Sequence, residues 1–335
     1  MDAAINNGEN AALNHNRKAL IKDGLLFVLM STLLYQLGLS VLVFISPLMV
    51  FAVKYGKSKT ALLMIVELFV ITALELVRGG LPDFSDSASL MSFAISIYFP
   101  LSLLAAGVTW LYASGVKVTK RLFISMLPII AISILYIVPF AVDRALFDGL
   151  YLLFEDAFAT LMEPVMDIIG ELDLGSMFYL MFLTILSMIL PLMMVAVCAS
   201  CFVYETSKHS KERDWEDRVR RFCFSSDLIW FLIISWALVL LGHFISMPAF
   251  VSVVLLNLAL TSIILYSAQG FSVLYAWLSR NRRQLKSMQL FLILAIIVMA
   301  IPGINFIIIF GLPIIGILES FFDLKKIGVK NEDYS

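Results

Sequence analysis

The sequence predicts an all-α protein: a polytopic transmembrane helical bundle of eight to ten membrane segments. Three observations predict this fold class. Hydrophobic residues make up 61% of the 335-residue chain and charged residues only 15%, against roughly 25% charged residues in soluble domains. The mean hydropathy is +0.95. Long apolar runs recur, with basic residues gathered between them. The net charge of -1 gives no reason to expect nucleic-acid binding.

Six apolar runs have about the 20 residues that a helix needs to cross a hydrocarbon core roughly 30 Å thick. Only a helix satisfies its own backbone hydrogen bonds there, so each run predicts one helical crossing. A longer run at each end of the chain, 24–53 or 288–322, could be one long helix or a hairpin. The six single crossings are 60–77, 89–113, 122–142, 177–204, 228–245 and 249–278.

The positions of the basic residues favour a hairpin at each end. Lys and Arg accumulate on the cytoplasmic side of short loops, and basic residues flank both terminal runs on both sides. We expect turns near Gly38 and at Pro302-Gly303, where proline removes a backbone donor. Both termini are then cytoplasmic, and of 24 Lys and Arg residues only Arg78 and Arg144 lie outside. Re-entrant half-helices would give the same sidedness with fewer full crossings.

We therefore expect one membrane domain, 24–322, between cytoplasmic tails 1–23 and 323–335. Its acidic outer loop, 143–176, has apolar residues at helical spacing, which predicts an amphipathic helix broken at Pro164 and Gly170. That helix lies on the outer interface, forms an acidic vestibule that attracts cations or a cationic substrate, or acts as a gate over a central site. In the basic cytoplasmic loop 205–226, alternating charges predict a salt-bridged surface helix over 208–221, which could also dock a soluble partner.

Glu67 is the clearest candidate for a functional residue. An ionisable group at mid-bilayer costs roughly 2.5 to 3.5 kcal/mol, so it needs a partner or a purpose. Glu67 either carries a proton or binds a substrate ammonium, or it stays protonated and bonds a neighbouring helix. Glu75 and Arg78 have the spacing of an interfacial ion pair. Interhelical hydrogen bonding is the default for the uncharged candidates at depth, which are Gln36, Asn257, Gln269 and Asn305.

No motif in the chain indicates catalysis or a cofactor. The sequence contains no H-E-x-x-H, no G-x-x-x-x-G-K-[ST] and no G-x-S-x-G. Cys198 and Cys201 lie one turn apart without a second cysteine pair or a histidine at ligand spacing, so we expect reduced thiols and no metal site. We do not expect an enzyme, and if ATP drives this protein, another subunit hydrolyses it.

The C-terminal third carries a series of recognisable segments. They are Ser226-Asp227-Leu228-Ile229-Trp230, Ala268-Gln269-Gly270-Phe271, the Pro302-Gly303 break, and Gly316-Ile317-Leu318-Glu319 followed by Asp323-Leu324-Lys325-Lys326. Over 222–327 the chain resembles the YybS-like family of bacterial integral membrane proteins, a domain of unknown function, and Ser46-Pro47-Leu48 is similar to the first hairpin of that family. The resemblance implies no activity. Such proteins are distantly similar to substrate-binding subunits of energy-coupling-factor vitamin transporters, which bind a small molecule within the membrane and use a separate ATPase module.

Our leading hypothesis is a multi-pass protein of the bacterial cytoplasmic (inner) membrane that binds or transports a small molecule. Glu67, the buried amides and the broken terminal hairpins are the usual indications of a site at the midplane. The expected partners are the lipid bilayer, a small-molecule ligand and a cytoplasmic or membrane subunit such as a transport ATPase module. The alternative is a non-transporting scaffold or envelope-assembly factor, in which 208–221 recruits a partner; an intramembrane enzyme comes third.

Overall fold

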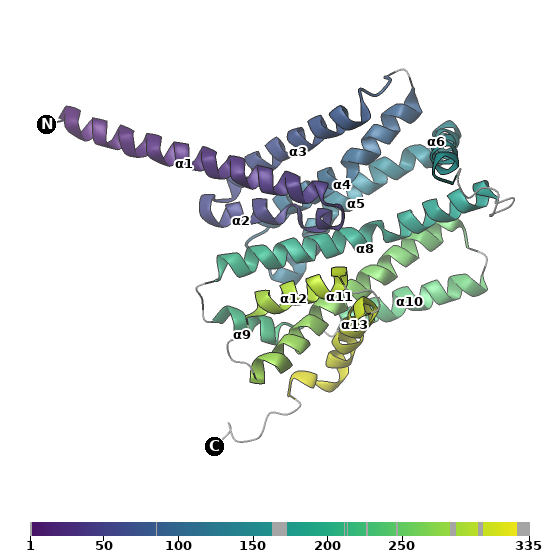
Figure 1. Cartoon of the computed structure of the whole chain (residues 1–335). Coiled ribbons are helices and arrows are strands. Elements are labelled where there is room, and N and C mark those ends of the chain that lie inside the picture. Colours follow the sequence, from purple (N-terminus) through teal and green to yellow (C-terminus); the bar gives the residue numbers. More distant parts are fainter. Residues whose placement is uncertain are drawn as a thin grey trace. The chain divides into compact units, whose positions relative to one another are not determined.

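The computed structural model describes residues 2–326, except 85, 163–172, 211, 213, 226, 246, 282–285 and 301–303. All regular structure in this part of the chain is helical, in twelve α-helices and two short 3-10 helices, so the predicted all-α class is confirmed (Figure 1). The chain forms two compact units. The first comprises Met1–Tyr179 and Ala199–Ser207, and the second comprises Leu180–Cys198 and Lys208–Ser335.

Six of the described helices are long and apolar enough to cross a membrane. They are Arg17–Gln36, Lys57–Gly79, Ser89–Tyr112, Val118–Phe140, Leu174–Lys208 and Ala249–Arg280. Every single crossing predicted from the sequence overlaps one of them, except 228–245. That run forms a shorter apolar helix, Leu228–Phe244. Two further apolar helices are also shorter, Ser287–Val298 and Phe306–Phe322.

The first unit begins with a long helix and a turn at Gly38, close to the position that the sequence indicates. Helix α1 (Asp2–Gln36) runs unbroken across residue 24, where we expected the tail to end. Gly38 has a φ of 62°, which glycine adopts without steric cost. After η1 (Gly38–Val43), α2 (Ser46–Tyr55) leads back along α1, and the Tyr55 hydroxyl donates to Asp23 at 2.6 Å. Ten residues extend only about 15 Å, half of a hydrocarbon core.

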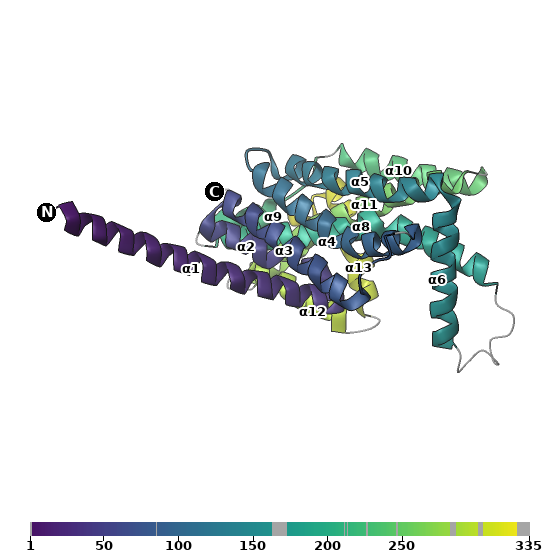
Figure 2. The same cartoon turned by 90° about the horizontal axis from the view of Figure 1, so that it is seen from above.

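The rest of the first unit contains α3 (Lys57–Gly79), α4 (Ser87–Tyr112), α5 (Val118–Val142), α6 (Arg144–Met162) and the ends of α8 (Leu174–Lys208). Gly107 of α4 lets the side chain of Met64 approach closely, since an added Cβ would lie 3.0 Å from its methyl carbon. Helix α6 confirms the helix expected at the start of 143–176, and it crosses α4 and α5 steeply (Figure 2). The breaks predicted at Pro164 and Gly170 lie outside the described residues.

The second unit is built around α11 (Ala249–Asn281), which contacts α9 (Asp214–Arg221), α10 (Leu228–Phe244), α13 (Ile304–Phe322) and η3 (Leu324–Lys326). Helix α12 (Ser287–Ala300) packs on α13, and the turn predicted between them at Pro302-Gly303 lies outside the described residues. The backbones of α11 and α13 touch at two glycines. A Cβ on Gly316 would lie 1.9 Å from the Tyr266 carbonyl oxygen, and one on Gly270 would lie 1.9 Å from that of Leu312.

Helix α9 confirms the second half of the helix with ion pairs predicted over 208–221, whereas Lys208 instead ends α8. Arg220 pairs with Asp217 at 3.1 Å, one turn apart. The helix is fastened to α11, because the Tyr275 hydroxyl donates to Glu216 at 2.7 Å and the Ser272 hydroxyl bonds to the Val219 carbonyl at 2.7 Å.

Candidate functional site

Glu67 lies on the buried side of α3 and faces α1. Thr60, Met64, Glu67 and Ile71 form the buried stripe of this helix, at the three- and four-residue spacing of one helical face. The Glu67 side chain has no exposed surface. Its Oε1 accepts a hydrogen bond from the Thr32 hydroxyl at 3.1 Å, whereas its Oε2 is buried without a partner among the described residues. Most buried polar atoms are hydrogen-bonded, so this oxygen is an exception that calls for an explanation.

Gln36 belongs to the same helix pair as Glu67. It follows Thr32 by four residues on α1, so both side chains project from one face of that helix. Both polar atoms of its amide, Oε1 and Nε2, are buried without a partner among the described residues. The unpartnered amide of Gln36 therefore lies one turn after Thr32, the residue of α1 that bonds the carboxylate of Glu67. Of the five candidate residues, Gln36 and Glu67 are the two that lie on the packed helices α1 and α3.

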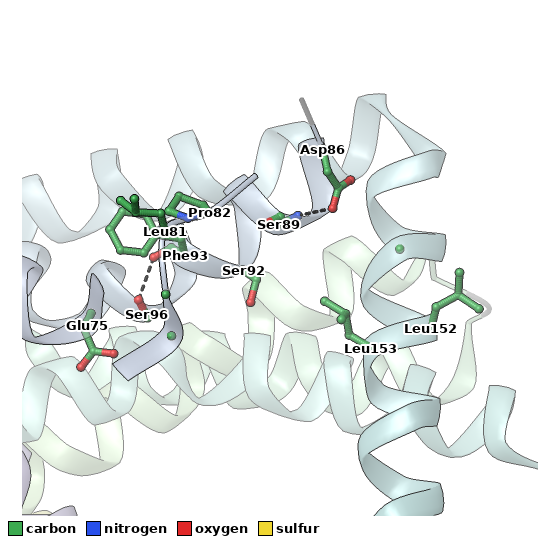
Figure 3. Close-up of a pocket in the computed structure, with 13 residues that line it drawn as sticks. Glu75, Leu81, Pro82, Asp86, Ser89, Ser92, Phe93, Ser96, Leu152 and Leu153 are labelled. Atoms are coloured by element: carbon green, nitrogen blue, oxygen red, sulfur yellow. Dashed lines mark hydrogen bonds between the residues drawn. The ribbon is translucent and has the colours of Figure 1, made fainter. Parts of the chain in front are cut away.

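A cavity of about 590 Å³ lies where α3 ends and α4 begins, with α6 along one side (Figure 3). Its polar lining includes two carboxylates and three serines, and Phe93 and Leu152 are among its apolar residues. None of the residues that line it is Lys, Arg or His. The polar residues are Glu75, Asp86, Ser89, Ser92 and Ser96. The cavity therefore combines apolar surface with hydrogen-bonding groups and negative charge.

The two carboxylates of the cavity have different roles. Asp86 precedes α4 and accepts from the backbone N–H of Ser89 at 3.0 Å, the geometry of an N-cap. Glu75 instead bonds through Oε1 to the Tyr35 hydroxyl at 3.1 Å, and its Oε2 makes no hydrogen bond or ion pair in the part of the chain described. The ion pair that we expected between Glu75 and Arg78 is absent among the described contacts. Of the two carboxylates in the cavity, Glu75 is therefore the one with an oxygen available to bind a ligand.

Tyr35 connects this cavity to the buried carboxylate. Its hydroxyl reaches Glu75 and lies 3.5 Å from the carbonyl oxygen of Ser96. It stands next to Gln36 in the sequence and three residues after Thr32, the partner of Glu67. Glu75 follows Glu67 by eight residues, or about 12 Å along α3. Helices α1 and α3 therefore carry a series of polar groups from the cavity into the interior of the first unit.

Asn257 belongs to the second unit, and helix contacts use its amide fully. Its Oδ1 accepts from the backbone N–H of Leu190 at 3.0 Å, and its Nδ2 donates to the carbonyl oxygens of Leu186 and Val253 at 2.7 and 2.9 Å. These bonds join α11 to α8, which is the interhelical role that is the default for such residues.

Gln269 has a comparable position at the crossing of α11 and α13. Its Oε1 accepts from the backbone N–H of Phe224 at 3.0 Å, and its Nε2 donates to the Gly316 carbonyl at 2.9 Å and to the Ser320 hydroxyl at 3.1 Å. Like Asn257, it lies in the unit that does not contain Glu67. Asn305 is part of α13, and its side chain is outside the described residues.

Sequence reasoning missed a buried ion pair in the first unit. Arg121 of α5 is 4% exposed; its Nη1 lies 2.6 Å from Oε1 of Glu205, and its Nε donates to the Trp110 carbonyl at 2.7 Å. Its guanidinium carbon is 4.0 Å from the centre of the Trp110 ring. From the sequence, both residues are expected in cytoplasmic segments, and because they lie 84 positions apart, no local spacing pairs them.

The described part of the chain contains no cluster of metal-ligating side chains. Within the described residues, no three His, Cys, Asp or Glu side chains lie together as a metal site requires. Cys198, Cys201 and Cys223 form no disulfide in the described part of the chain.

No protein-family model matches the chain, and no curated protein or solved structure is significantly similar to it. The resemblance to the YybS-like family stays a prediction from the segments quoted above.

Proposed function

We propose that the chain is a multi-pass protein of the bacterial cytoplasmic membrane that binds a small molecule from the outer side and moves it across, alone or as the membrane-embedded subunit of a transporter. Six helices of sufficient length and apolarity support the membrane location. The clustering of Lys and Arg in alternate loops supports cytoplasmic termini and eight to ten segments, the shorter helices included. In that topology the cavity at the end of α3 opens outward.

The observation that carries this proposal is the outer cavity with the available carboxylate of Glu75. Its volume of about 590 Å³ falls within the roughly 300 to 1,000 Å³ of small-molecule sites, which are mostly apolar with a few placed polar groups. A polar series through Tyr35 leads from it to Glu67, and buried ionisable groups of this kind mark pathways in transport proteins.

The lining of the cavity favours a small organic cation such as a primary or secondary amine. Glu75 and Asp86 supply negative charge, and none of the lining residues is basic, although Arg78 directly precedes the lining residue Gly79. An anionic ligand would meet like charges, which weaken binding. Phe93 and Leu152 offer apolar surface for a carbon skeleton, and the serine hydroxyls can accept hydrogen bonds from an ammonium group.

The scaffold alternative depends on 208–221 as a docking surface. Several groups of this segment are used within the second unit, because Glu216 accepts from both Tyr275 and the backbone N–H of Ser287, and the Val219 carbonyl accepts from Ser272. This favours a structural role for α9 and leaves transport as our first choice. A transport ATPase module remains a proposed partner, and an intramembrane enzyme remains the third possibility.

The test is to purify the full chain in a mild detergent, denature it, and identify by mass spectrometry the small molecules that are released and the proteins that co-purify. We expect an amine-bearing compound from the wild-type chain. Glu75→Gln should lose it, whereas Asp156→Asn, an equal charge change at an exposed position of α6 outside the cavity, should retain it. A ligand-free protein that carries only envelope-assembly partners would favour the scaffold.

A further inference from the structure

We propose that Glu67 is a reversible proton-binding site that couples proton movement to transport; this rests on the proposed function. The proposal starts from two groups with buried, unpartnered polar atoms, one on each of the packed helices α1 and α3. Glu67 has no exposed surface and an unused Oε2, and Gln36 has an amide with neither atom paired among the described residues. A buried carboxylate that has one hydrogen bond and no counter-ion is disfavoured relative to its protonated form.

The helices packed against α3 supply no positive charge for Glu67. Helix α4 contains no charged residue, and its ionisable groups are Tyr98 and Tyr112. Helix α2 has Lys54 as its one charged residue, with Tyr55 beside it, and both bond to Asp23 of α1. Asp23 precedes Thr32 by nine residues, about 13 Å along α1, so this group lies well away from Glu67.

The polar side chains of α1 after Asp23 carry only hydroxyl and amide groups. Tyr35 bonds to Glu75 and Thr32 to Glu67, while the Ser31 hydroxyl donates to the Phe44 carbonyl at 2.8 Å. The basic residues of this helix, Arg17, Lys18 and Lys22, all precede Asp23. Among the described residues, the carboxylate of Glu67 therefore has one hydrogen-bond donor, Thr32, and no ion-pair partner.

A proton fits this site better than a metal cation. A hard cation collects several oxygen ligands, and no group of three or more His, Cys, Asp or Glu side chains lies together among the described residues. One proton on Oε2 neutralises the charge and changes an unpartnered acceptor into a donor. The amide oxygen of Gln36 is an unpartnered acceptor on the same face of α1. When the O–H bond of Glu67 breaks, the proton passes to a water molecule and the carboxylate remains.

Dicyclohexylcarbodiimide, an apolar reagent that adds to protonated carboxyl groups, tests this proposal. The purified full chain would be treated across a pH series, and the modified residues identified by peptide mass spectrometry. We expect modification of Glu67 at neutral pH, a decline at alkaline pH, and no effect of sodium at constant pH. Thr32→Val removes the hydrogen bond that favours the carboxylate, so it should move the decline to higher pH.

Two controls separate this proposal from the function on which it rests. Glu75→Gln should leave the modification of Glu67 unchanged. If this variant loses the cavity ligand while the pH dependence of Glu67 modification stays the same, the substitution affects ligand binding in the cavity and not the proton site. An empty cavity with normal Glu67 modification would contradict the proposed function and leave the proton site standing. An unmodified Glu67 in folded protein, a yield independent of pH, or protection by sodium would each overturn the proton site.

Discussion

Asn257 of α11 accepts a hydrogen bond from the backbone N–H of Leu190 in α8 at 3.0 Å, and donates one to the Leu186 carbonyl four residues earlier. In a regular helix these two backbone groups bond to each other. Pro191 follows directly and lacks an N–H, which weakens the helix at this point. The amide of Asn257 therefore secures α8 beside its proline and fastens α11 to it.

Replacing Asn257 with leucine should lower the free energy of unfolding by about 1 to 3 kcal/mol, because two backbone groups and a helix contact lose their partner. Thermal unfolding of the purified protein in detergent measures the effect. Thr184→Val is the control, since this exposed hydroxyl bonds to the Leu180 carbonyl of its own helix and its loss should cost less than about 0.5 kcal/mol. Equal melting temperatures for the two variants would contradict the role of Asn257.

Gly316→Ala should destabilise the second unit by about 3 kcal/mol, because the added Cβ would lie 1.9 Å from the Tyr266 carbonyl oxygen and backbone cannot move aside cheaply. Gly311 is the matched control on the same helix, since no atom lies within 4 Å of a Cβ built there. Expression level and thermal stability of the two variants provide the comparison. A well-tolerated Gly316→Ala would show that α11 and α13 do not approach this closely.

Removing one member of the Arg121–Glu205 pair should cost about 3 to 5 kcal/mol, because the remaining charge stays buried without its partner. We expect this loss for Arg121→Met and for Glu205→Leu. The double variant should lose less stability than the sum of the two single losses. Lys54→Met provides the contrast: Lys54 also pairs with an acidic residue, Asp23, but its side chain is 64% exposed, so little change is expected. Additive losses in the double variant would argue against a coupled pair.

Lys325 and Lys54 should give stability opposite dependences on pH. Burial lowers the pKa of Lys325 below its ordinary value of 10.5, although Glu319 opposes the shift. The unfolded chain therefore holds this proton more tightly, and the free energy of unfolding rises as pH increases toward 10.5. The hydrogen bond to Asp23 raises the pKa of Lys54. Its stabilisation is fully present below 10.5 and is lost as pH rises through the raised pKa.

Unfolding measured across the alkaline range checks this prediction. Lys325→Met should remove a rising contribution to the stability curve, and Lys54→Met should remove a falling one. If both variants changed the slope in the same direction, the buried environment assigned to Lys325 would be incorrect.

The sequence by itself determined the all-α class, the long apolar helices, the turn close to Gly38 and the helix of alternating charges at Asp214–Arg221. Each of these depends on local information. Hydropathy over about 20 residues sets whether a helix can lie in hydrocarbon, a glycine permits a positive φ, and charge spacing along one helix needs no knowledge of its neighbours.

Tertiary structure alone decided which side chains meet. Glu75 bonds to Tyr35, 40 residues away, instead of pairing with Arg78 on its own helix. Gln269 fastens α13, whereas Gln36, an amide of the same type, is left with both polar atoms unpaired among the described residues. The cavity exists because α3, α4 and α6 converge. These outcomes depend on how whole helices pack, and the periodicity of one segment contains no information about the helix that will face it.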